Sequence, residues 1–308
     1  MVQAIKRDEV FIEPEGIHIE THQPERRSRK PPLLLIHGVL TGSWLWNEFA
    51  VYLAERGWEA HAMNLRGHFT SDVADLAETT MRDYADDVGV AMRQLGRPAV
   101  LIGWGIGALV ALMHAERTPP LGLVLLAPSP PAAALPRRPD EHELRAVPSV
   151  YDAAWWGWTG TREELRERMP DLDDHDIEKI RELLDGARES GLARRERMEG
   201  IPIDAAALAD TPSMVIGAGR DDVIHPSEAR RTADLLGAGY EYFPSASHFG
   251  LVMGEHTWPE VAQSVHGWLE ERRHAMVAAS AAAVPVGAPL GVGETFAERP
   301  ARFERPRY

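Results

Sequence analysis

Three glycines in five residues mark one turn of this chain, Gly103-Trp104-Gly105-Ile106-Gly107. The apolar run 99–102 before the turn predicts a buried strand, and the apolar run 108–114 after it predicts a helix. A strand that passes through such a turn straight into a helix presents the middle residue at the tip. Here that residue is Gly105, which has no side chain with which to attack a substrate.

Strands and helices alternate along much of the remaining chain. Runs typical of strands lie at 10–13, 17–20, 31–36, 58–64, 121–127, 213–218 and 239–243, and helical spacing lies at 44–56, 80–95 and 258–274. The first two runs predict a hairpin. The later alternation predicts an α/β fold, with a mainly parallel sheet that carries helices on both faces.

The alternation is interrupted between 128 and about 210 by a charged segment of helical character. Because the strand pattern resumes afterwards, we interpret this segment as a cap inserted into one domain. The expected parts are an N-terminal part of the core over 1–131, a helical cap over 132–210, a C-terminal part of the core over 211–274, and an extended or disordered tail over 275–308. A tail that wraps onto the second subunit of a homodimer is the alternative.

Composition excludes several classes of function. The formal net charge of -14 disfavours nucleic acid and anionic membranes as partners. The chain has no cysteine, which excludes disulfides, thiolate chemistry and cysteine-ligated zinc. Neither a signal segment nor a run of membrane-spanning length is visible, so we expect a cytoplasmic protein. We expect no metal and no cofactor.

Four motifs follow the predicted strands in order. They are His37-Gly38, then Asn64-Leu65-Arg66-Gly67-His68, then the glycine-rich turn, then Gly219 to Pro226 together with Ser245 to Gly250. In this order they resemble the α/β-hydrolase superfamily, over about residues 9–272. The resemblance implies the α/β-hydrolase fold with a helical cap. It does not define a reaction, because this fold supports many chemistries.

The resemblance also implies a catalytic histidine and its carboxylate partner. His248 lies in the small-residue loop after the last strand, where the family carries its base. Asp222 aligns with the acid, three residues after Gly219 and four before Pro226, and Asp221 is expected to be a solvated turn residue. In such a pair the carboxylate orients the imidazole and stabilises its charged form.

Two backbone N–H groups would form the oxyanion hole by the same resemblance, those of Val39 and Ile106. Ile106 also opens the predicted helix, whose N-terminus favours developing negative charge. His37 and His68 are expected to be structural, holding their turns.

In the family, the position of Gly105 carries the nucleophile, so its identity leaves several interpretations open. Glycine relieves the strained backbone of such a turn, as expected after a loss of function. It could instead make room for substrate, or be an engineered change in an ordinary serine hydrolase. Ser129 and Ser43 are candidates for a displaced nucleophile.

Tryptophans near the motifs point to the substrate. We expect five of them to line an apolar pocket for an aromatic or other bulky hydrophobic ligand: Trp44, Trp104, Trp155, Trp156 and Trp158. The leading hypothesis is an enzyme in which His248 acts as general base on a carbonyl or phenol substrate. Hydrolysis without a covalent intermediate, C–C bond chemistry and cyclisation remain open, and a biosynthetic tailoring step is one setting for them. The rival is a catalytically silent protein that binds a small molecule.

Overall fold

The computed structural model describes residues 4–26, 28–158, 161–254 and 256–283. Eight strands form one sheet in the order β1-β2-β4-β3-β5-β6-β9-β10. Their bounds are β1 (Ile5–Ile12), β2 (Ile17–Pro24), β3 (Leu33–Ile36), β4 (Ala60–Met63), β5 (Val100–Trp104), β6 (Gly122–Leu126), β9 (Ser213–Ala218) and β10 (Gly239–Phe243). The hairpin β1-β2 joins β4 antiparallel, and every other pairing in this sheet is parallel.

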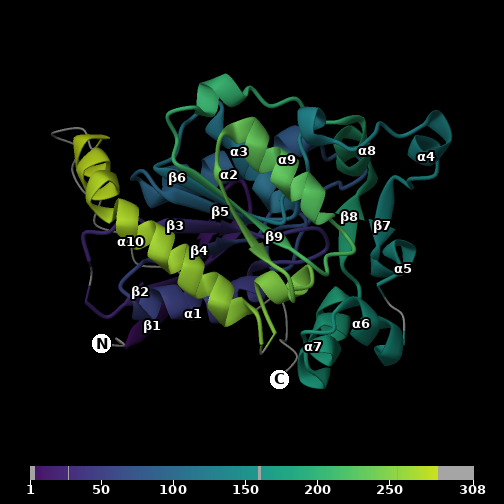
Figure 1. Cartoon of the computed structure of the whole chain (residues 1–308), viewed down its shortest axis with the longest axis horizontal. Coiled ribbons are helices and arrows are strands. Elements are labelled where there is room, and N and C mark those ends of the chain that lie inside the picture. The colour runs from purple at the N-terminus through teal and green to yellow at the C-terminus, as the bar shows by residue number, and fades with distance from the viewer. Residues whose placement is uncertain (1–3, 27, 159–160, 255, 284–308) are drawn as a thin grey trace.

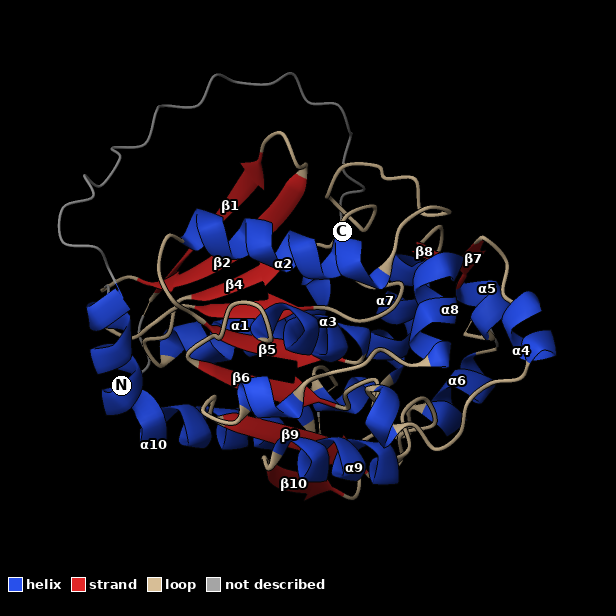
Figure 2. Cartoon of the chain, turned by 90° about the horizontal axis from the view of Figure 1, so that it is seen from above, coloured by secondary structure: helices blue, strands red, loops and turns tan. Residues whose placement is uncertain are grey.

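Helices cover both faces of the sheet, as the alternating sequence predicts (Figures 1 and 2). One face carries α2 (Met81–Leu95), α3 (Ile106–Ala115) and α9 (Pro226–Leu236), and the other carries α1 (Asn47–Glu55) and α10 (Trp258–Ala283). The central strands β3, β5 and β6 are buried at every position, because helices exclude water from both of their sides.

Local sequence explains where α2 begins and ends. The Thr80 side chain accepts a hydrogen bond from the Asp83 N–H, and the Asp83 carboxylate accepts one from the Thr80 N–H, which satisfies two donors of the first turn. Gly96 ends the helix in the left-handed conformation, with φ 63°. The helix predicted at 80–95 is therefore confirmed to within one residue.

The inserted segment lies between β6 and β9 and is called the cap below. It contains η2 (Ala132–Ala134), α4 (Glu141–Arg145), β7 (Val150–Asp152), α5 (Ala153–Trp156), α6 (Arg162–Arg168), α7 (Asp174–Leu184), β8 (Arg188–Ser190), α8 (Gly191–Glu199) and η3 (Ala205–Leu208). It gathers largely at one end of the sheet, at the right of Figure 1. The pair β7-β8 was not predicted, because three-residue strands are too short to show a period of two.

The last helix is longer than predicted. α10 continues to Ala283, whereas the sequence placed the start of an extended tail at 275. The added residues are rich in alanine, which has the highest helix propensity of any residue, so the composition that suggested a tail also favours a helix. The rest of the expected tail, 284–308, lies outside the described residues.

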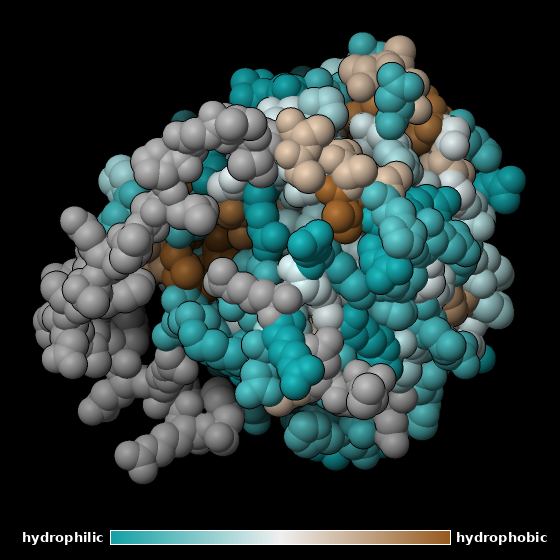
Figure 3. Space-filling model, turned by 90° about the vertical axis from the view of Figure 1, so that its left-hand side faces the viewer, coloured by the Kyte–Doolittle hydropathy of each residue, from teal (hydrophilic) through white to brown (hydrophobic). Residues whose placement is uncertain are grey.

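A chain in which 26% of the residues are charged is expected to have a largely hydrophilic surface. The face in Figure 3 is mostly hydrophilic, and its apolar residues form separate small spots. Among the described helices, none combines the length and the apolar character needed to cross a bilayer.

Candidate active site

The glycine-rich turn joins β5 to α3, and its three glycines differ in the room around them. A Cβ atom on Gly103 would lie 2.5 Å from the Cα of Ala108, and one on Gly107 would lie 2.3 Å from the carbonyl oxygen of His37. Both positions therefore require glycine. A Cβ on Gly105 would meet nothing nearer than Nε2 of His248, at 3.5 Å. Only the middle glycine has space for a side chain, although its backbone (φ 58°, ψ -120°) is strained for other residues.

His248 is oriented by Asp221. The imidazole Nδ1 lies 2.7 Å from Oδ2 of Asp221, and both side chains are buried. The other carboxylate oxygen of Asp221 accepts the N–H groups of Val223 and Ile224, at 2.8 and 2.7 Å. Because an ionised carboxylate only accepts, Nδ1 carries the proton, and the lone pair of Nε2 faces Gly105.

The prediction that Asp222 is the partner of His248 is wrong. Asp222 is 40% exposed, and its Oδ2 accepts a hydrogen bond from Nε of Arg168 in the cap at 2.5 Å. Counting residues from Gly219 and Pro226 could not decide between two adjacent aspartates. The turn decides, because Asp221 binds the backbone ahead of it, which directs its side chain inward and leaves Asp222 outside.

Two further contacts hold the His248 loop. Nε1 of Trp104 donates to the carbonyl oxygen of His248 at 3.0 Å, and the two rings lie 4.4 Å apart. The N–H of Ser247 donates to Oδ2 of Asp171, a cap residue, at 3.0 Å. His248 and its loop are therefore held by Asp221 after β9, by Trp104 of the glycine-rich turn and by Asp171 of the cap.

The two expected oxyanion donors lie in the same cavity as Gly105 and His248. Neither the N–H of Val39 nor that of Ile106 has an acceptor among the described residues. Ile106 is the first residue of α3, where N–H groups lack partners within the helix and the dipole favours an anion. Together the two groups can bind an oxygen that becomes negative.

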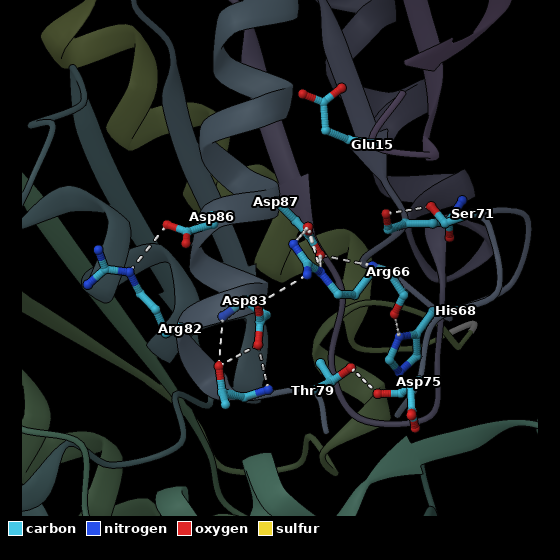
Figure 4. A network of polar contacts seen from close by, with 12 residues as sticks. Glu15, Arg66, His68, Ser71, Asp75, Thr79, Arg82, Asp83, Asp86 and Asp87 are labelled. Atoms are coloured by element: carbon cyan, nitrogen blue, oxygen red, sulfur yellow. Dashed lines mark hydrogen bonds and ion pairs between the residues drawn. The ribbon is translucent and has the colours of Figure 1, made fainter. Parts of the chain in front are cut away.

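The turn after β4 is held by charge. Arg66 reaches α2, where its Nε and Nη2 donate to Oδ1 of Asp87 at 2.9 and 2.6 Å, and its Nη1 donates to Asp83 at 3.1 Å (Figure 4). Nδ1 of His68 lies 2.9 Å from the carbonyl oxygen of Arg66. His37 is a second anchor, because its Nε2 accepts the N–H of Leu65 at 3.0 Å.

A buried glutamate of the cap joins this turn to the oxyanion loop. Glu189 in β8 accepts hydrogen bonds from His68 at 3.1 Å, from the Tyr84 hydroxyl at 2.5 Å and from the N–H of Leu40 at 3.4 Å. Burial acts to raise the pKa of Glu189, but His68, the Tyr84 hydroxyl and the N–H of Ser190 outweigh it and lower the pKa to about 2. Leu40 directly follows Val39, so the cap supports the oxyanion loop. Nothing in the sequence distinguished Glu189 from its exposed neighbours.

The cavity over Gly105 is small, with about 10 Å3 of open space, close to the room that one water molecule needs. Its walls are Val39, Trp104, Gly105, Ile106, Ser129, Trp156, Trp158, Arg197, Val223, Ile224 and His248. Three of the five expected tryptophans are therefore brought together.

The other two expected tryptophans lie elsewhere. Trp155 is 42% exposed, because its side chain leaves α5 on the outer side. Trp44 lines a separate hollow of about 570 Å3 between the turn at His68 and the cap strands, which shares no residue with the cavity over Gly105.

The two serines considered as displaced nucleophiles differ. Ser43 lies outside the cavity and donates to Glu20 at 2.8 Å. Ser129 lines the cavity; its N–H donates to the carbonyl oxygen of Gly105 at 2.9 Å, and its Oγ accepts from Nη1 of Arg197 at 3.1 Å. Arg197 was not predicted, since it is one of many charged residues in the cap.

One exposed group in the cap has the composition of a cation site. The ligand atoms of Asp173, His175 and Asp176 lie within 4.8 Å of one another at the start of α7. None of these residues lines the cavity over Gly105. They contribute nothing to the chemistry described above.

Comparison with known proteins agrees with this geometry. Residues 33–264 match the model of the "Alpha/beta hydrolase family". The chain is 31% identical over 175 residues to a pimeloyl-[acyl-carrier protein] methyl ester esterase of Methylococcus capsulatus, a match that covers 56% of this chain and 63% of the esterase. The match thus spans less than two thirds of that relative.

Solved structures show the same fold at low identity. Naproxen esterase from Bacillus subtilis aligns with a TM-score of 0.64 and 19% identity, covering 87% of this chain and 92% of the esterase. A thioesterase domain from the curacin biosynthetic pathway aligns with a TM-score of 0.60 and 18% identity, covering 86% and 99%.

Proposed function

The chain belongs to the alpha/beta hydrolase family, and from that premise we propose that it hydrolyses an ester or thioester without forming a covalent intermediate on the protein. The observation that carries this proposal is the space over Gly105. It has about the room that one water molecule needs, and it lies beside the nitrogen of His248 that is free to accept a proton. We interpret Gly105 as replacing the nucleophilic residue of the family with room for the attacking water.

The reaction would proceed in two steps. Nε2 of His248 takes a proton from the water as its oxygen bonds to the carbonyl carbon, and the carbonyl oxygen becomes an anion held by the N–H groups of Val39 and Ile106. Asp221 stabilises the imidazolium. The intermediate then expels the alcohol or thiol, which receives the proton from His248. An ester and water are thereby converted into an acid and an alcohol.

The relatives support an acyl substrate, since the proteins named above are esterases and a thioesterase. We prefer hydrolysis to C–C bond chemistry and to cyclisation. The space beside His248 accommodates a water molecule, which can act as the nucleophile that Gly105 does not provide. Trp156 and Trp158 form an apolar part of the wall of the cavity that contains Gly105. An apolar or aromatic group next to the carbonyl fits such a wall, and a bulky one requires these rings to separate.

The test combines turnover with labelling. The wild type should hydrolyse p-nitrophenyl esters of short acids, show no acyl adduct by intact-protein mass spectrometry, and resist a fluorophosphonate probe. Labelling that disappears in Ser129→Ala would show a displaced nucleophile and overturn the proposal. Binding of an ester that is never hydrolysed would favour the silent binding protein instead.

A further inference from the structure

Arg197 is a cation in the wall of the cavity, and no carboxylate of the described residues forms an ion pair with it. It lies on α8 and lines the cavity together with Gly105 and His248. Its Nη1 donates to Oγ of Ser129 at 3.1 Å, and its guanidinium carbon lies 5.7 Å from the ring centroid of Trp156. In the part of the chain that the structure describes, no ion pair includes Arg197 or its neighbours on α8, Arg194 and Arg195. Of these three, only Arg197 lines the cavity.

The surroundings of Arg197 disfavour its charge. Burial lowers the pKa of its guanidinium and the nearby charge of Arg194 adds to this, while Tyr151 and Glu189 act the other way. Glu189 does not pair with Arg197, because its two carboxylate oxygens accept hydrogen bonds from His68 and Tyr84. Arg197 is partly buried, and a partly desolvated cation is costly unless an anion completes it.

The position of Arg197 places that anion beside the reacting group. The carbonyl oxygen of Gly105 accepts the N–H of Ser129, and Oγ of Ser129 accepts from Arg197. Ser129 therefore links the guanidinium of Arg197 to the glycine-rich turn through two hydrogen bonds. The Ser129 hydroxyl still has its own hydrogen to donate, so it and the guanidinium can serve one ligand together.

We infer that the substrate carries a carboxylate close to the hydrolysed bond, and that Arg197 and Ser129 bind it. This inference rests on the proposed function in one respect, that the reacting bond of the substrate lies in the cavity over Gly105. The guanidinium is a planar fork that matches the two oxygens of a carboxylate. A single cation against neutral tryptophan walls fits one negative charge, which favours a carboxylate over a phosphate dianion.

A bound carboxylate is larger than the open space, so Trp156 or Trp158 must move to admit it. Tryptophan fluorescence therefore reports on binding. Benzoate and benzamide are suitable probes, since they have the same shape and differ in charge. The wild type should bind benzoate at least about ten-fold more tightly than benzamide. This comparison does not depend on the folding of any variant.

Variants assign the preference to Arg197. Arg197→Gln should lose at least about ten-fold in affinity for benzoate and keep its affinity for benzamide. The matched control is Arg194→Gln, one turn earlier on α8, where the guanidinium lies 4.3 Å from the Trp156 ring but does not line the cavity. It should retain the preference.

Three results would overturn the inference: equal binding of the two probes by the wild type, a preference that survives Arg197→Gln, or phenyl phosphate displacing benzoate as the tighter ligand. His248→Gln separates this inference from the proposed function. That variant should lose ester hydrolysis and keep the preference for benzoate over benzamide, whatever its affinity for each probe, because His248 lines the cavity but does not carry the positive charge. Arg197-dependent binding by a wild type that hydrolyses no ester would contradict the proposed hydrolysis and leave the carboxylate site standing.

Discussion

Nε2 of His248 lies 3.5 Å from the position that a Cβ atom on Gly105 would occupy. A side chain at residue 105 would therefore lie within reach of the imidazole. The flanking glycines cannot be replaced in the same way, since atoms of the backbone approach them to 2.5 Å or less. Replacement of Gly105 is thus a direct experiment on the chemistry of the cavity.

The variant Gly105→Ser should introduce a nucleophile. Its Oγ would lie within reach of His248, which can remove its proton as in other serine hydrolases. We expect the variant to react with a fluorophosphonate probe at residue 105 and the wild type to remain unlabelled. An unreactive serine in a folded variant would show that His248 does not serve as a base at this position.

The variant Gly105→Ala is the matched control for that experiment. It adds the Cβ atom without the hydroxyl, so it fills the space assigned to water and supplies no nucleophile. Ester hydrolysis should fall at least about ten-fold, while labelling stays absent. Wild-type turnover in this variant would show that the space over Gly105 is not used.

Two adjacent aspartates offer a second matched pair. Asp221→Asn should reduce kcat by about 10²–10³, because an amide at this position favours the wrong tautomer of His248. Asp222→Asn removes only a partly exposed ion pair with Arg168, so kcat should stay within about two-fold. The kinetics of both variants, measured on one ester, check the assignment. The opposite order of effects would restore Asp222 as the partner.

Stability should separate the three glycines of the turn. Gly103→Ala and Gly107→Ala force a methyl group against backbone atoms, and overpacking of this kind costs at least about 1–3 kcal/mol. Gly105→Ala meets no clash and should cost on the order of 1–2 kcal/mol for its positive φ. Urea unfolding of the three variants gives the ranking. A Gly105→Ala variant that is less stable than both others would contradict the geometry.

Acid should unfold the protein through its buried histidines. Burial is the main cause that lowers the pKa of His37 to about 3 and the pKa values of His22 and His61 to about 4, from 6.5. Below pH 6.5 these histidines therefore bind protons in the unfolded chain and remain neutral in the native state. Stability should be complete above pH 6.5 and fall towards pH 4, with each histidine contributing about 1.4 kcal/mol per pH unit.

His22 allows this pH dependence to be tested at one residue. Neither of its ring nitrogens has a hydrogen-bond partner among the described residues. His22→Phe removes the titrating group at little cost in packing. Between pH 6 and pH 4.5, the free energy of unfolding of the variant should fall less steeply with pH than that of the wild type. The difference in slope should correspond to the uptake of about one proton fewer on unfolding. Parallel curves would show that His22 does not titrate in this range.

The sequence predicted most of the core because its signals are local. The strands at 213–218 and 239–243 agree with β9 and β10 to the residue, since each is a short run bounded by residues that favour turns. The start of α2 follows from a capping box within four residues. By contrast, the strands of the cap are three residues long, and α10 continues through alanines that also suited a tail.

The site was predictable where family motifs cover it and not where the cap completes it. His248, Val39 and Ile106 surround Gly105 as the resemblance implied. The choice between Asp221 and Asp222 depended on the direction of a turn, which a residue count does not contain. Arg197 and Glu189 lie in a segment full of charges. Glu189 is buried and Arg197 partly buried by contacts with residues 68 to 149 positions away in the chain.

The most direct test of the central claim is the kcat/KM of p-nitrophenyl acetate hydrolysis by the wild type and by His248→Gln, after intact-protein mass spectrometry has shown that neither carries an acyl group during turnover. Glutamine keeps much of the volume of the imidazole but cannot accept the proton. We expect His248→Gln to lose at least about 10²–10³ in kcat/KM. Equal values for the two proteins would contradict the role of His248 as general base.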